Sequence, residues 1–443
     1  MNSYLKCVNQ KCGKEYPILS TDFKCSCGNL LDVKYKNSPS SNLKEVFYKR
    51  RNPEGSIFNE SGVWRFRELL NFCEIDTEDL EQCSKNLVSL DGSEGRQSKP
   101  YHMSKVASFV GIDNERLMLQ PEGYNPSGSF KDNGMSAAVT HAKMVNAKKI
   151  ICASTGNTSA SAGMFAANEN MECDVYIPEG EISPGKLSQA YQFGTQMIHV
   201  KGTFDDAFVK SLNASKESGS YTVNSINPFR IEGQKTIPYR ALEFLNWEVP
   251  DWIVYPGGAL GNTSSCGKCI MELYEWGWIK KIPRIAVINA EGANTLDVLY
   301  NGKFEDTELR WNKGDPNVEL IDQYYSKMND DGIRPQTKAT AIQIGKPANI
   351  LKGLRALEFT DGVVTSVTDN EMLDGMSIVG LNGFDCEMAS GAVPAGVKKL
   401  MGEEIIKKDD TVIGILTGRQ KEPLLPIEYH NNISNKFARP PKK

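Results

Sequence analysis

The chain has 443 residues, of which 40% are hydrophobic and 24% charged, as in globular proteins large enough to bury a sizeable core. The formal net charge is −4, from 51 basic and 55 acidic residues, which gives no electrostatic reason to expect nucleic acid or an anionic membrane as a partner. No apolar run approaches the roughly 18 residues that span a bilayer. The first residues lack the apolar core of a signal peptide, so we expect a cytoplasmic protein.

Cysteines crowd the start of the chain. Four of the eleven are Cys7, Cys12, Cys25 and Cys27, and the second and fourth of these are each followed by glycine. Such a glycine lets a tight turn adopt a positive φ, and thiolates on two turns can converge tetrahedrally on one zinc ion. Four residues separate Cys7 from Cys12 and one separates Cys25 from Cys27, whereas paired ligands of a zinc ribbon usually have two residues between them. We predict a zinc-ribbon-like module over residues 1–35, against the alternative of four reduced cysteines in an appended hairpin.

From residue 117 onward, short apolar segments alternate with helical patterns, after a linker at 36–41 and a mixed region at 42–116. The expected strands are 117–119, 149–153, 173–177, 196–200, 221–223, 252–255 and 285–288, and the helices that follow the first six are 132–146, 158–168, 185–193, 204–217, 231–246 and 262–278. A polar excursion at 295–337 interrupts this rhythm. It resumes with a helix at 347–358, a strand at 363–367, helices at 369–380 and 391–401, and a strand at 411–416. This alternation predicts an α/β fold of open, mostly parallel sheets with helices on both faces.

Lys131 follows a turn-rich loop and opens a good helical pattern. A lysine in this place sits in the positive field of the helix N-terminus. That field disfavours the ammonium form and eases formation of the neutral amine, which can attack a carbonyl group. A single lysine in a loop is most often an ordinary surface residue, so its interpretation depends on the rest of the chain.

Three further loops lie where expected strands end. Residues 154–161 (Ser-Thr-Gly-Asn-Thr-Ser-Ala-Ser) offer hydroxyl, amide and free N–H groups that could hold an anion, which is more than one helix cap needs. Residues 257–263 (Gly-Gly-Ala-Leu-Gly-Asn-Thr) could close a backbone nest on a phosphate, although a plain tight turn has the same composition. Thr417 places a hydroxyl at the end of the last strand.

Ligands of parallel sheets bind at the carboxyl ends of the strands, so the four loops are expected to meet. A lysine nucleophile, a polar loop, a phosphate-sized nest and a strand-end hydroxyl together match the functional groups of pyridoxal phosphate. We therefore predict this cofactor.

Long motifs at these positions resemble those of the threonine synthases, a family of fold type II (tryptophan-synthase-β-like) pyridoxal phosphate enzymes. The matching segments are 125–132 (Asn-Pro-Ser-Gly-Ser-Phe-Lys-Asp), 154–161, 224–236 (Asn-Ser-Ile-Asn-Pro-Phe-Arg-Ile-Glu-Gly-Gln-Lys-Thr), 338–347 (Lys-Ala-Thr-Ala-Ile-Gln-Ile-Gly-Lys-Pro) and 386–392 (Cys-Glu-Met-Ala-Ser-Gly-Ala). The resemblance spans residues 85–425. It implies two open twisted, mostly parallel sheets in a catalytic region, 42–443, with two α/β subdomains, the smaller at 135–225.

The resemblance also implies residue roles. The cofactor would bind through Lys131 as Schiff-base lysine and proton shuttle, Asn157 at the pyridoxal 3′-oxygen, Thr417 at the ring nitrogen, and Gly258, Ala259, Leu260, Gly261 and Asn262 at the 5′-phosphate. The substrate would bind to Ser154, Thr155, Asn224 and Arg230, the last two at its phosphate. An arginine fork suits a phosphate geometrically; the alternative for Arg230 is a surface ion pair.

Enzymes of this family convert O-phospho-L-homoserine and water to L-threonine and phosphate. We expect this lyase reaction on a small-molecule amino acid, in a homodimer. Two alternatives stay open. The first is another fold type II enzyme, such as a threonine or serine dehydratase or a β-replacement enzyme that uses a phosphorylated amino acid, and the second is a non-catalytic protein that docks a partner through its N-terminal module. The retained lysine argues against the second, and Arg230 with Asn224 argues against the dehydratases, because substrates without a phosphate do not need them.

Three segments depart from the family pattern. The usual Gly-x-Thr-Pro-Leu segment is absent, and residues 94–103 read Glu-Gly-Arg-Gln-Ser-Lys-Pro-Tyr-His-Met. Asn133 stands where the Schiff-base motif usually has arginine. Residues 419–423, Arg-Gln-Lys-Glu-Pro, replace the usual His-Gly-Leu-Lys-Asp-Pro.

Overall fold

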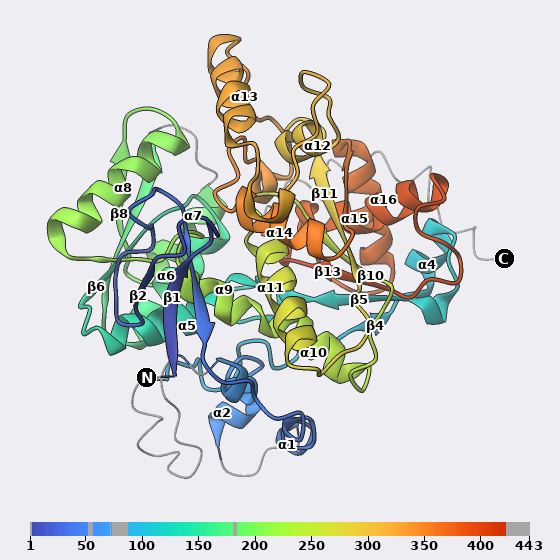
Figure 1. Cartoon of the computed structure of the whole chain (residues 1–443), viewed down its shortest axis with the longest axis horizontal. Helices are drawn as coiled ribbons and strands as arrows, with labels where there is room; N and C mark the ends of the chain where they lie inside the picture. Colours follow the sequence, from blue (N-terminus) through green and yellow to red (C-terminus); the bar gives the residue numbers. More distant parts are fainter. Residues whose placement is uncertain (1, 52–55, 71, 73–86, 180–183, 422–443) are drawn as a thin grey trace.

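The protein contains three β-sheets, which the computed structural model describes for residues 2–51, 56–70, 72, 87–179 and 184–421. The first sheet is formed by β1 (Ser3–Cys7), β2 (Glu15–Pro17) and β3 (Leu31–Tyr35), in the antiparallel order β2-β1-β3. It carries the four N-terminal cysteines and lies in front of the helices of the four-stranded sheet (Figure 1).

The largest sheet has six strands in the order β12-β11-β10-β13-β5-β4. They are β12 (Val363–Val367), β11 (Arg284–Ala290), β10 (Trp252–Pro256), β13 (Val412–Leu416), β5 (Leu117–Pro121) and β4 (Tyr101–His102). Every neighbouring pair is parallel except β4 with β5. The other sheet has four parallel strands in the order β8-β7-β6-β9, namely β8 (Gln196–Val200), β7 (Glu172–Pro178), β6 (Lys149–Ala153) and β9 (Tyr221–Thr222). Two mostly parallel sheets confirm the predicted fold class.

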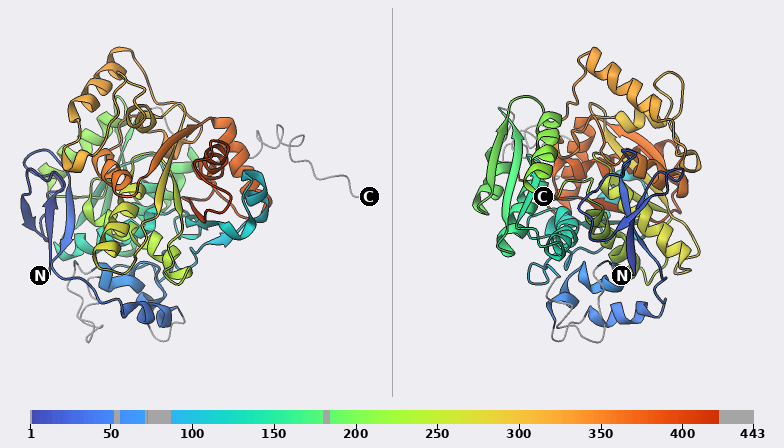
Figure 2. Two further views of the ribbon diagram at one scale, coloured as in Figure 1. Left: turned by 45° about the vertical axis from the view of Figure 1, so that its right-hand side comes forward. Right: turned by 60° about the vertical axis from the view of Figure 1, so that its left-hand side comes forward.

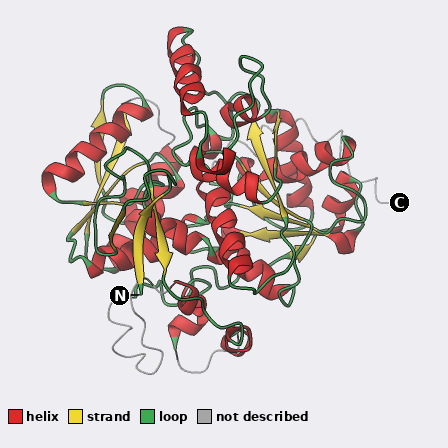
Figure 3. Ribbon diagram, in the orientation of Figure 1, coloured by secondary structure: helices red, strands yellow, loops and turns green. Residues whose placement is uncertain are grey.

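Helices cover both faces of the six-stranded sheet, as Figure 3 shows. Its central strand β10 turns Ile253 and Tyr255 toward one buried cluster and Trp252 and Val254 toward another, which is the two-residue period of a strand buried on both faces. The first cluster includes residues of α10 (Thr236–Phe244), α11 (Gly261–Glu275) and α14 (Ile350–Phe359), and the second those of α4 (Ser104–Val110), α15 (Asp369–Leu381) and α16 (Met388–Gly402).

The four-stranded sheet and the cysteine-rich sheet share a third hydrophobic cluster. It joins Leu5 and Phe23 of the N-terminal module to Ala137 of α5 (Lys131–Met144) and Phe229 of α9 (Pro228–Gln234). The helices that follow the strands of this sheet are α6 (Asn157–Asn168), α7 (Pro184–Gln192) and α8 (Phe204–Ser218). Figure 2 shows the N-terminal sheet from two further sides. The module therefore lies on the helix pair α5 and α9.

Two regions differ from the expected elements. The single helix expected at 231–246 is two helices, α9 and α10, because Pro238 in the first turn of α10 has no N–H to continue the helical bonds of α9. The excursion at 295–337 contains α12 (Thr295–Tyr300) and α13 (Val318–Asp330), and α13 projects away from the sheets (Figure 1). Asn317 caps α13 by accepting a hydrogen bond from the N–H of Leu320 at 3.1 Å.

Short elements complete the described chain, in which no helix is both long enough and apolar enough to cross a bilayer. They are α1 (Leu43–Arg50), α2 (Ile57–Glu60) and the 3₁₀ segments Trp64–Leu70, Asn114–Arg116, Glu122–Tyr124, Asn312–Gly314 and Thr340–Ile342.

The close crossing of α5 and α9 depends on Gly233. A Cβ atom at this position would lie 2.0 Å from the backbone oxygen of Asn133. Because that atom belongs to the main chain, no change of a side-chain rotamer can relieve the clash. We expect Gly233→Ala to lower the free energy of unfolding by about 1–3 kcal/mol, measured by urea or thermal denaturation. The matched control is Gly380→Ala on α15, where the added methyl meets no atom within 4 Å and raises stability slightly through helix propensity. Equal stability of the two variants would contradict the close-contact argument.

Candidate functional site

Four loops of the predicted site leave the carboxyl ends of neighbouring strands. In the six-stranded sheet, β10, β13 and β5 are adjacent, and they lead into the glycine-rich loop, Thr417 and the lysine loop. In the other sheet, β6 leads into residues 154–157 and its neighbour β9 leads toward Asn224. In each sheet the predicted residues therefore lie at the edge where the parallel strands end, as we expected from the strand pattern.

Backbone contacts join the lysine loop to the end of β13. The N–H of Phe130 donates to the carbonyl oxygen of Thr417 at 2.9 Å, and the N–H of Arg419 donates to that of Gly128 at 2.9 Å. Between them, Ser129 and Gly418 form an isolated antiparallel bridge. These contacts hold the backbone just before Lys131 against the end of β13.

Lys131 is the first residue of α5, and its Nζ lies 4.1 Å from the ring centroid of Phe130. Burial lowers the pKa of Lys131 to about 7, and the positive charge of Arg230 acts in the same direction. The carboxylate of Glu387 opposes both effects. A substantial fraction of neutral amine is therefore present at neutral pH, which is what a lysine nucleophile needs.

Arg230 is a buried cation, 1% exposed, on α9. Its Nη1 donates to the carbonyl oxygen of Val223 at 3.0 Å, whereas its Nε and Nη2 have no hydrogen-bond partner within the described part of the chain. Burial lowers its pKa to about 10, so the guanidinium stays charged at neutral pH. Buried charges are normally paired, and a guanidinium with two unused donors is suited to a phosphate. The surface ion pair considered from the sequence is wrong.

Glu387 links two of the predicted cofactor residues. Its carboxylate accepts a hydrogen bond from Nδ2 of Asn157 at 2.9 Å and one from Oγ1 of Thr417 at 3.0 Å. Ser390 completes the group, with its Oγ 3.1 Å from Oγ1 of Thr417. Both residues belong to the 386–392 motif, for which we predicted no role from the sequence. Their position just before and within the first turn of α16 was the available signal.

The glycine-rich loop leads into α11 through Leu260, which has a left-handed backbone (φ 62°). Such a conformation is uncommon for a residue with a side chain and marks a constrained site. It alternates with right-handed residues in backbone nests that bind anions. At the start of α11, Oδ1 of Asn262 and Oγ1 of Thr263 are buried with no partner among the described residues. Asn349 holds the loop by donating to the carbonyl oxygens of Ala259 and Ser225.

The amide of Asn224 is used by the backbone of Ala153. Its Oδ1 accepts from the N–H of Ala153 at 3.0 Å, and its Nδ2 donates to the carbonyl oxygen at 2.9 Å. Asn224 thus braces the end of β6, immediately before Ser154 and Thr155, which are partly exposed. Ser154 Oγ accepts from the N–H of Gly156 at 3.2 Å.

Asn133, which departs from the family's motif, is hydrogen-bonded to a buried arginine that is distant in sequence. Arg240 of α10 donates from Nη2 to both oxygens of Glu122 at 2.7 and 2.9 Å, and from Nη1 to Oδ1 of Asn133 at 3.0 Å. Nδ2 of Asn133 in turn donates to Glu122 Oε2 at 2.8 Å. Asn125 donates to the same oxygen at 2.9 Å. A buried guanidinium from another helix therefore braces the lysine loop.

The segment 419–423 closes one side of the site as far as residue 421. A Cβ atom at residue 128 would lie 2.5 Å from Nε of Arg419, and the backbone there has a φ of 86°. Both conditions favour glycine at this position. Nζ of Lys421 donates to Oδ1 of Asn157 at 2.9 Å. Residues 422 and 423 lie outside the described residues.

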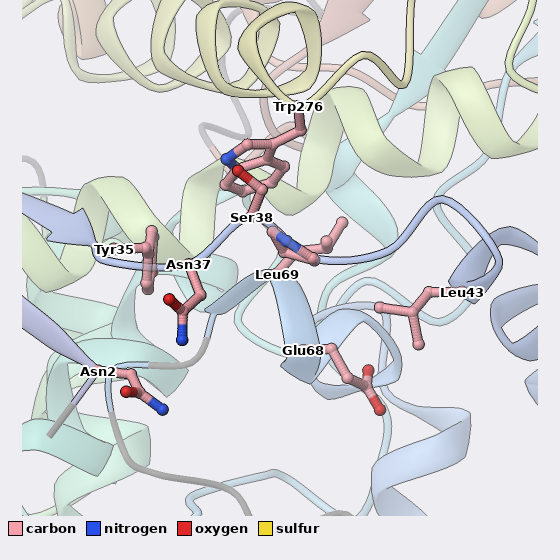
Figure 4. A pocket seen from close by; sticks show the side chains of 9 residues that line it. Asn2, Tyr35, Asn37, Ser38, Leu43, Glu68, Leu69 and Trp276 are labelled. Carbon is pink, nitrogen blue, oxygen red and sulfur yellow. The ribbon is translucent and has the colours of Figure 1, made fainter.

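A hollow of about 190 Å³ lies elsewhere, where the linker 36–41 passes α11. Tyr35, Asn37, Glu68 and Trp276 are among its lining side chains (Figure 4). None of the predicted site residues lines this hollow. It is therefore separate from the candidate site, which is formed where the loops meet.

Residues 100–418 match a family model described as pyridoxal-phosphate dependent enzyme. The threonine synthase of Methanocaldococcus jannaschii is 35% identical over 98% of this chain and 99% of its own length. The chain belongs to this family, among its threonine synthases. The threonine synthase of Methanosarcina acetivorans is 33% identical over 96% of this chain and 94% of its own, and that of a Bacillus species is 39% identical over 73% and 82%.

Solved structures of pyridoxal phosphate enzymes share the fold. A fungal L-serine ammonia-lyase from Rhizomucor miehei matches with a TM-score of 0.60 and 18% identity, covering 75% of this chain and 97% of its own. Maize serine racemase matches with a TM-score of 0.57 and 17% identity, covering 76% and 93%. At these identities the likeness concerns the fold alone.

The residues present fit the family's cofactor, pyridoxal phosphate. A phosphate fits the start of α11, because the buried hydroxyl of Thr263, which has no partner in the described chain, can donate to it beside the left-handed Leu260, and a helix N-terminus attracts anions. An aldehyde fits Lys131, whose pKa of about 7 leaves a reactive amine. The predicted cofactor is confirmed by the family, whereas the role of each residue stays a prediction.

Proposed function

We propose that the chain converts O-phospho-L-homoserine and water to L-threonine and phosphate, with pyridoxal phosphate bound to Lys131. The observation that carries this proposal is Arg230, a buried cation with two unused donors that acts on the charge state of Lys131. A substrate that brings its own phosphate pairs this cation, whereas a serine or threonine substrate leaves it unpaired at a cost in free energy.

The cofactor supplies an electron sink for charge that develops at the substrate carbons. Gly258, Ala259, Leu260, Gly261 and Asn262 would hold its phosphate, Asn157 its 3′-oxygen, and Thr417 its ring nitrogen. Because Thr417 offers a neutral hydroxyl, it leaves the ring nitrogen less cationic than a carboxylate would. In the described structure Asn157 and Thr417 both hydrogen-bond Glu387, so this carboxylate orients them.

Lys131 is the base that moves protons in this proposal. Its amine takes a proton from Cα of the substrate and later returns one there. Between these two events it also moves protons at Cβ and Cγ. One amine can do this because the substrate is held within its reach. Arg230 binds the phosphate that leaves from Cγ, and its pairing stabilises the departing charge. Ser154 and Thr155, at the start of α6, would hold the substrate carboxylate.

The test compares three substrates in parallel. We expect phosphate release and L-threonine formation from O-phospho-L-homoserine, with little keto acid from L-threonine and little phosphate from O-phospho-L-serine. A keto acid as the main product from L-threonine would instead support a dehydratase, and turnover of O-phospho-L-serine with an added nucleophile would support a β-replacement enzyme. Failure of all three, with cofactor bound, would favour the non-catalytic alternative.

The pH dependence of cofactor loading follows from the lowered pKa of Lys131. Only the neutral amine attacks the aldehyde, so a pKa of about 7 makes the loading rate rise about tenfold from pH 6 to 8 and then level off. A lysine of ordinary pKa would instead give a rise that continues to about pH 10. The rate is read from the absorbance change when cofactor is mixed with cofactor-free protein.

Two variants check the sign of this pH dependence. Arg230→Gln removes a positive charge that lowers the pKa of Lys131, so the midpoint should move to higher pH. Glu387→Gln removes a negative charge that raises this pKa, so the midpoint should move to lower pH. A simple alkylamine measured under the same conditions corrects for ionisation of the cofactor itself. Shifts in the opposite directions would contradict the electrostatic argument.

The remaining expectations concern the surroundings of the enzyme. A homodimer in the cytoplasm, without nucleic-acid or membrane partners, stays part of the proposal. The charge balance of 51 basic and 55 acidic residues supports the absence of a polyanionic partner.

A further inference from the structure

Four sulfur atoms meet at one end of the N-terminal sheet. The Sγ atoms of Cys7, Cys12, Cys25 and Cys27 all lie within 4.8 Å of one another. The shortest pairs are Cys7 with Cys27 at 3.5 Å and Cys12 with Cys25 at 3.6 Å. These distances exceed the ~2.05 Å of a disulfide bond. They approach the ~3.8 Å that separates two sulfurs of a tetrahedral site with metal–sulfur bonds of ~2.3 Å.

Two polar side chains donate hydrogen bonds to the sulfurs. The hydroxyl of Tyr16 donates to the Cys25 sulfur at 3.2 Å, and Nδ2 of Asn29 donates to the Cys27 sulfur at 3.5 Å. Donors aimed at sulfur favour the thiolate, which is the form that binds metals.

The turns have the predicted backbone. Gly13 and Gly28, each directly after a cysteine, have φ values of 59° and 87°, so the expectation of a positive φ is confirmed. In the part of the chain that the structure describes, this is the one group of three or more potential ligands gathered closely enough for a metal.

We propose that the four thiolates bind one zinc ion, and that the ion holds the segment between the two ligand pairs against α5 and α9. Four sulfur ligands complete the tetrahedral shell and leave no position for substrate, so the site is structural. Because a module of this size has only a small core of its own, such a cross-link adds to the order of the segment between the ligand pairs. This proposal goes beyond the catalytic function and does not depend on it.

The segment between the ligand pairs reaches both catalytic helices. The carbonyl oxygen of Ile18 lies 2.8 Å from Nε2 of His141 on α5. Burial lowers the pKa of His141 to about 4, and its neutral ring stacks on Phe229 of α9 with centroids 3.5 Å apart. Phe23 packs edge-on against the same Phe229, at 6.4 Å. Phe229 directly precedes Arg230, so the metal-bound segment supports the backbone that presents this cation.

The strand after the second ligand pair is joined to the catalytic region by buried charges. Asp32 of β3 pairs with Lys352 at 2.9 Å and with Arg355 at 2.6 Å. The hydroxyl of Tyr35 donates to Glu232 of α9. Separation of the module would leave these groups unpaired, at a cost. The module therefore stays attached through β3 even without the ion. The ion keeps the segment 13–24, between the two ligand pairs, ordered.

The first experiment measures metal in the full-length protein, purified under reducing conditions. We expect one zinc ion per chain in the wild type, released in step with titration of the thiols by an organic mercurial. Replacement by Co²⁺ should give the intense visible absorption of a tetrahedral tetrathiolate site. Cys27→Ser, which changes the one exposed ligand of the four, should weaken zinc binding, and Cys25→Ser/Cys27→Ser should abolish it. The matched control is Cys173→Ser, a buried cysteine outside the group, which should keep its zinc.

The second experiment tests the coupling by amide hydrogen exchange with and without chelator. Removal of zinc should increase exchange in peptides covering loop 13–24 and α9, and leave α15 unchanged. Wild-type protein without zinc, a Co²⁺ spectrum of fewer than four sulfur ligands, or zinc retained by the double variant would overturn the site. Zinc loss without faster exchange in α9 would overturn its coupling to the catalytic helices. The Co²⁺ spectrum of the wild type decides the site even if the double variant fails to fold.

Discussion

Lys131→Ala is expected to lower kcat at least about 1,000-fold, because it removes both the group that binds the cofactor covalently and the proposed proton carrier. Lys421 is a second lysine at the site, where it donates to Asn157. The absorption band of lysine-bound cofactor should vanish as well. Turnover is measured as phosphate released from O-phospho-L-homoserine, and the band by spectrophotometry.

The matched control is Lys143→Ala, a lysine of the same helix, α5. Its ammonium pairs with Glu169 at 2.8 Å, and its side chain is 30% exposed, so an effect on stability of no more than about 1 kcal/mol is expected. Kinetics and cofactor spectrum should match those of the wild type. An Lys131→Ala protein that keeps the band and turns over substrate would contradict the assignment of this lysine.

The strands were predictable because each carries a local signal. Residues 149–153, 196–200 and 363–367 were expected as strands and are β6, β8 and β12 with the same bounds. Buried parallel strands give short apolar runs between turn residues. The break between α9 and α10 also had a local signal, Pro238, but the helical periodicity continues across it and conceals the break. Thus local sequence patterns predict that a helix or strand exists more reliably than they predict where it begins and ends.

The site was predictable to the extent that its parts lie at strand ends. Lys131, Thr417 and the glycine-rich loop follow three adjacent strands, and strand ends of a parallel sheet meet by geometry. Glu387 and Arg240 could not be assigned in this way, because each acts through partners far away in sequence. Arg240 bonds Glu122, 118 residues earlier, and Glu387 bonds Asn157, 230 residues earlier. Such pairs depend on tertiary packing, which a single sequence does not display.

Arg240 also shows why the surroundings of Asn133 were hard to predict. Asn133 departs from the family's usual motif, and its partner comes from α10, far along the chain. Arg240 pairs with Glu122, which accepts bonds from Gln120, Asn125 and Asn133 as well. A carboxylate buried at 0% exposure needs such a partner. Arg240 therefore supplies the cation that braces the lysine loop around Asn133.

Arg230→Gln should lower kcat/KM for O-phospho-L-homoserine more than 100-fold. Two charge-assisted hydrogen bonds from Nε and Nη2 to the substrate phosphate are worth about 3 kcal/mol or more together. The loss should appear in KM, because the phosphate is bound in the ground state, and also in kcat, because its charge grows as it leaves. Inhibition by inorganic phosphate should weaken in parallel, which gives a binding measurement independent of turnover.

Two further variants separate phosphate recognition from packing. Arg230→Lys keeps the charge but loses the planar fork, so it should recover part of the activity and leave phosphate inhibition weaker than in the wild type. Arg284→Gln removes a surface arginine of β11 whose partner Asp361 is 89% exposed, and should leave kcat and KM unchanged. The cofactor spectrum should be retained in all three variants, since none of them touches the glycine-rich loop. If Arg230→Gln kept its KM for the phosphorylated substrate and its inhibition by phosphate, the two unpaired donors would need another ligand, and the substrate would have to be sought among amino acids without a phosphate.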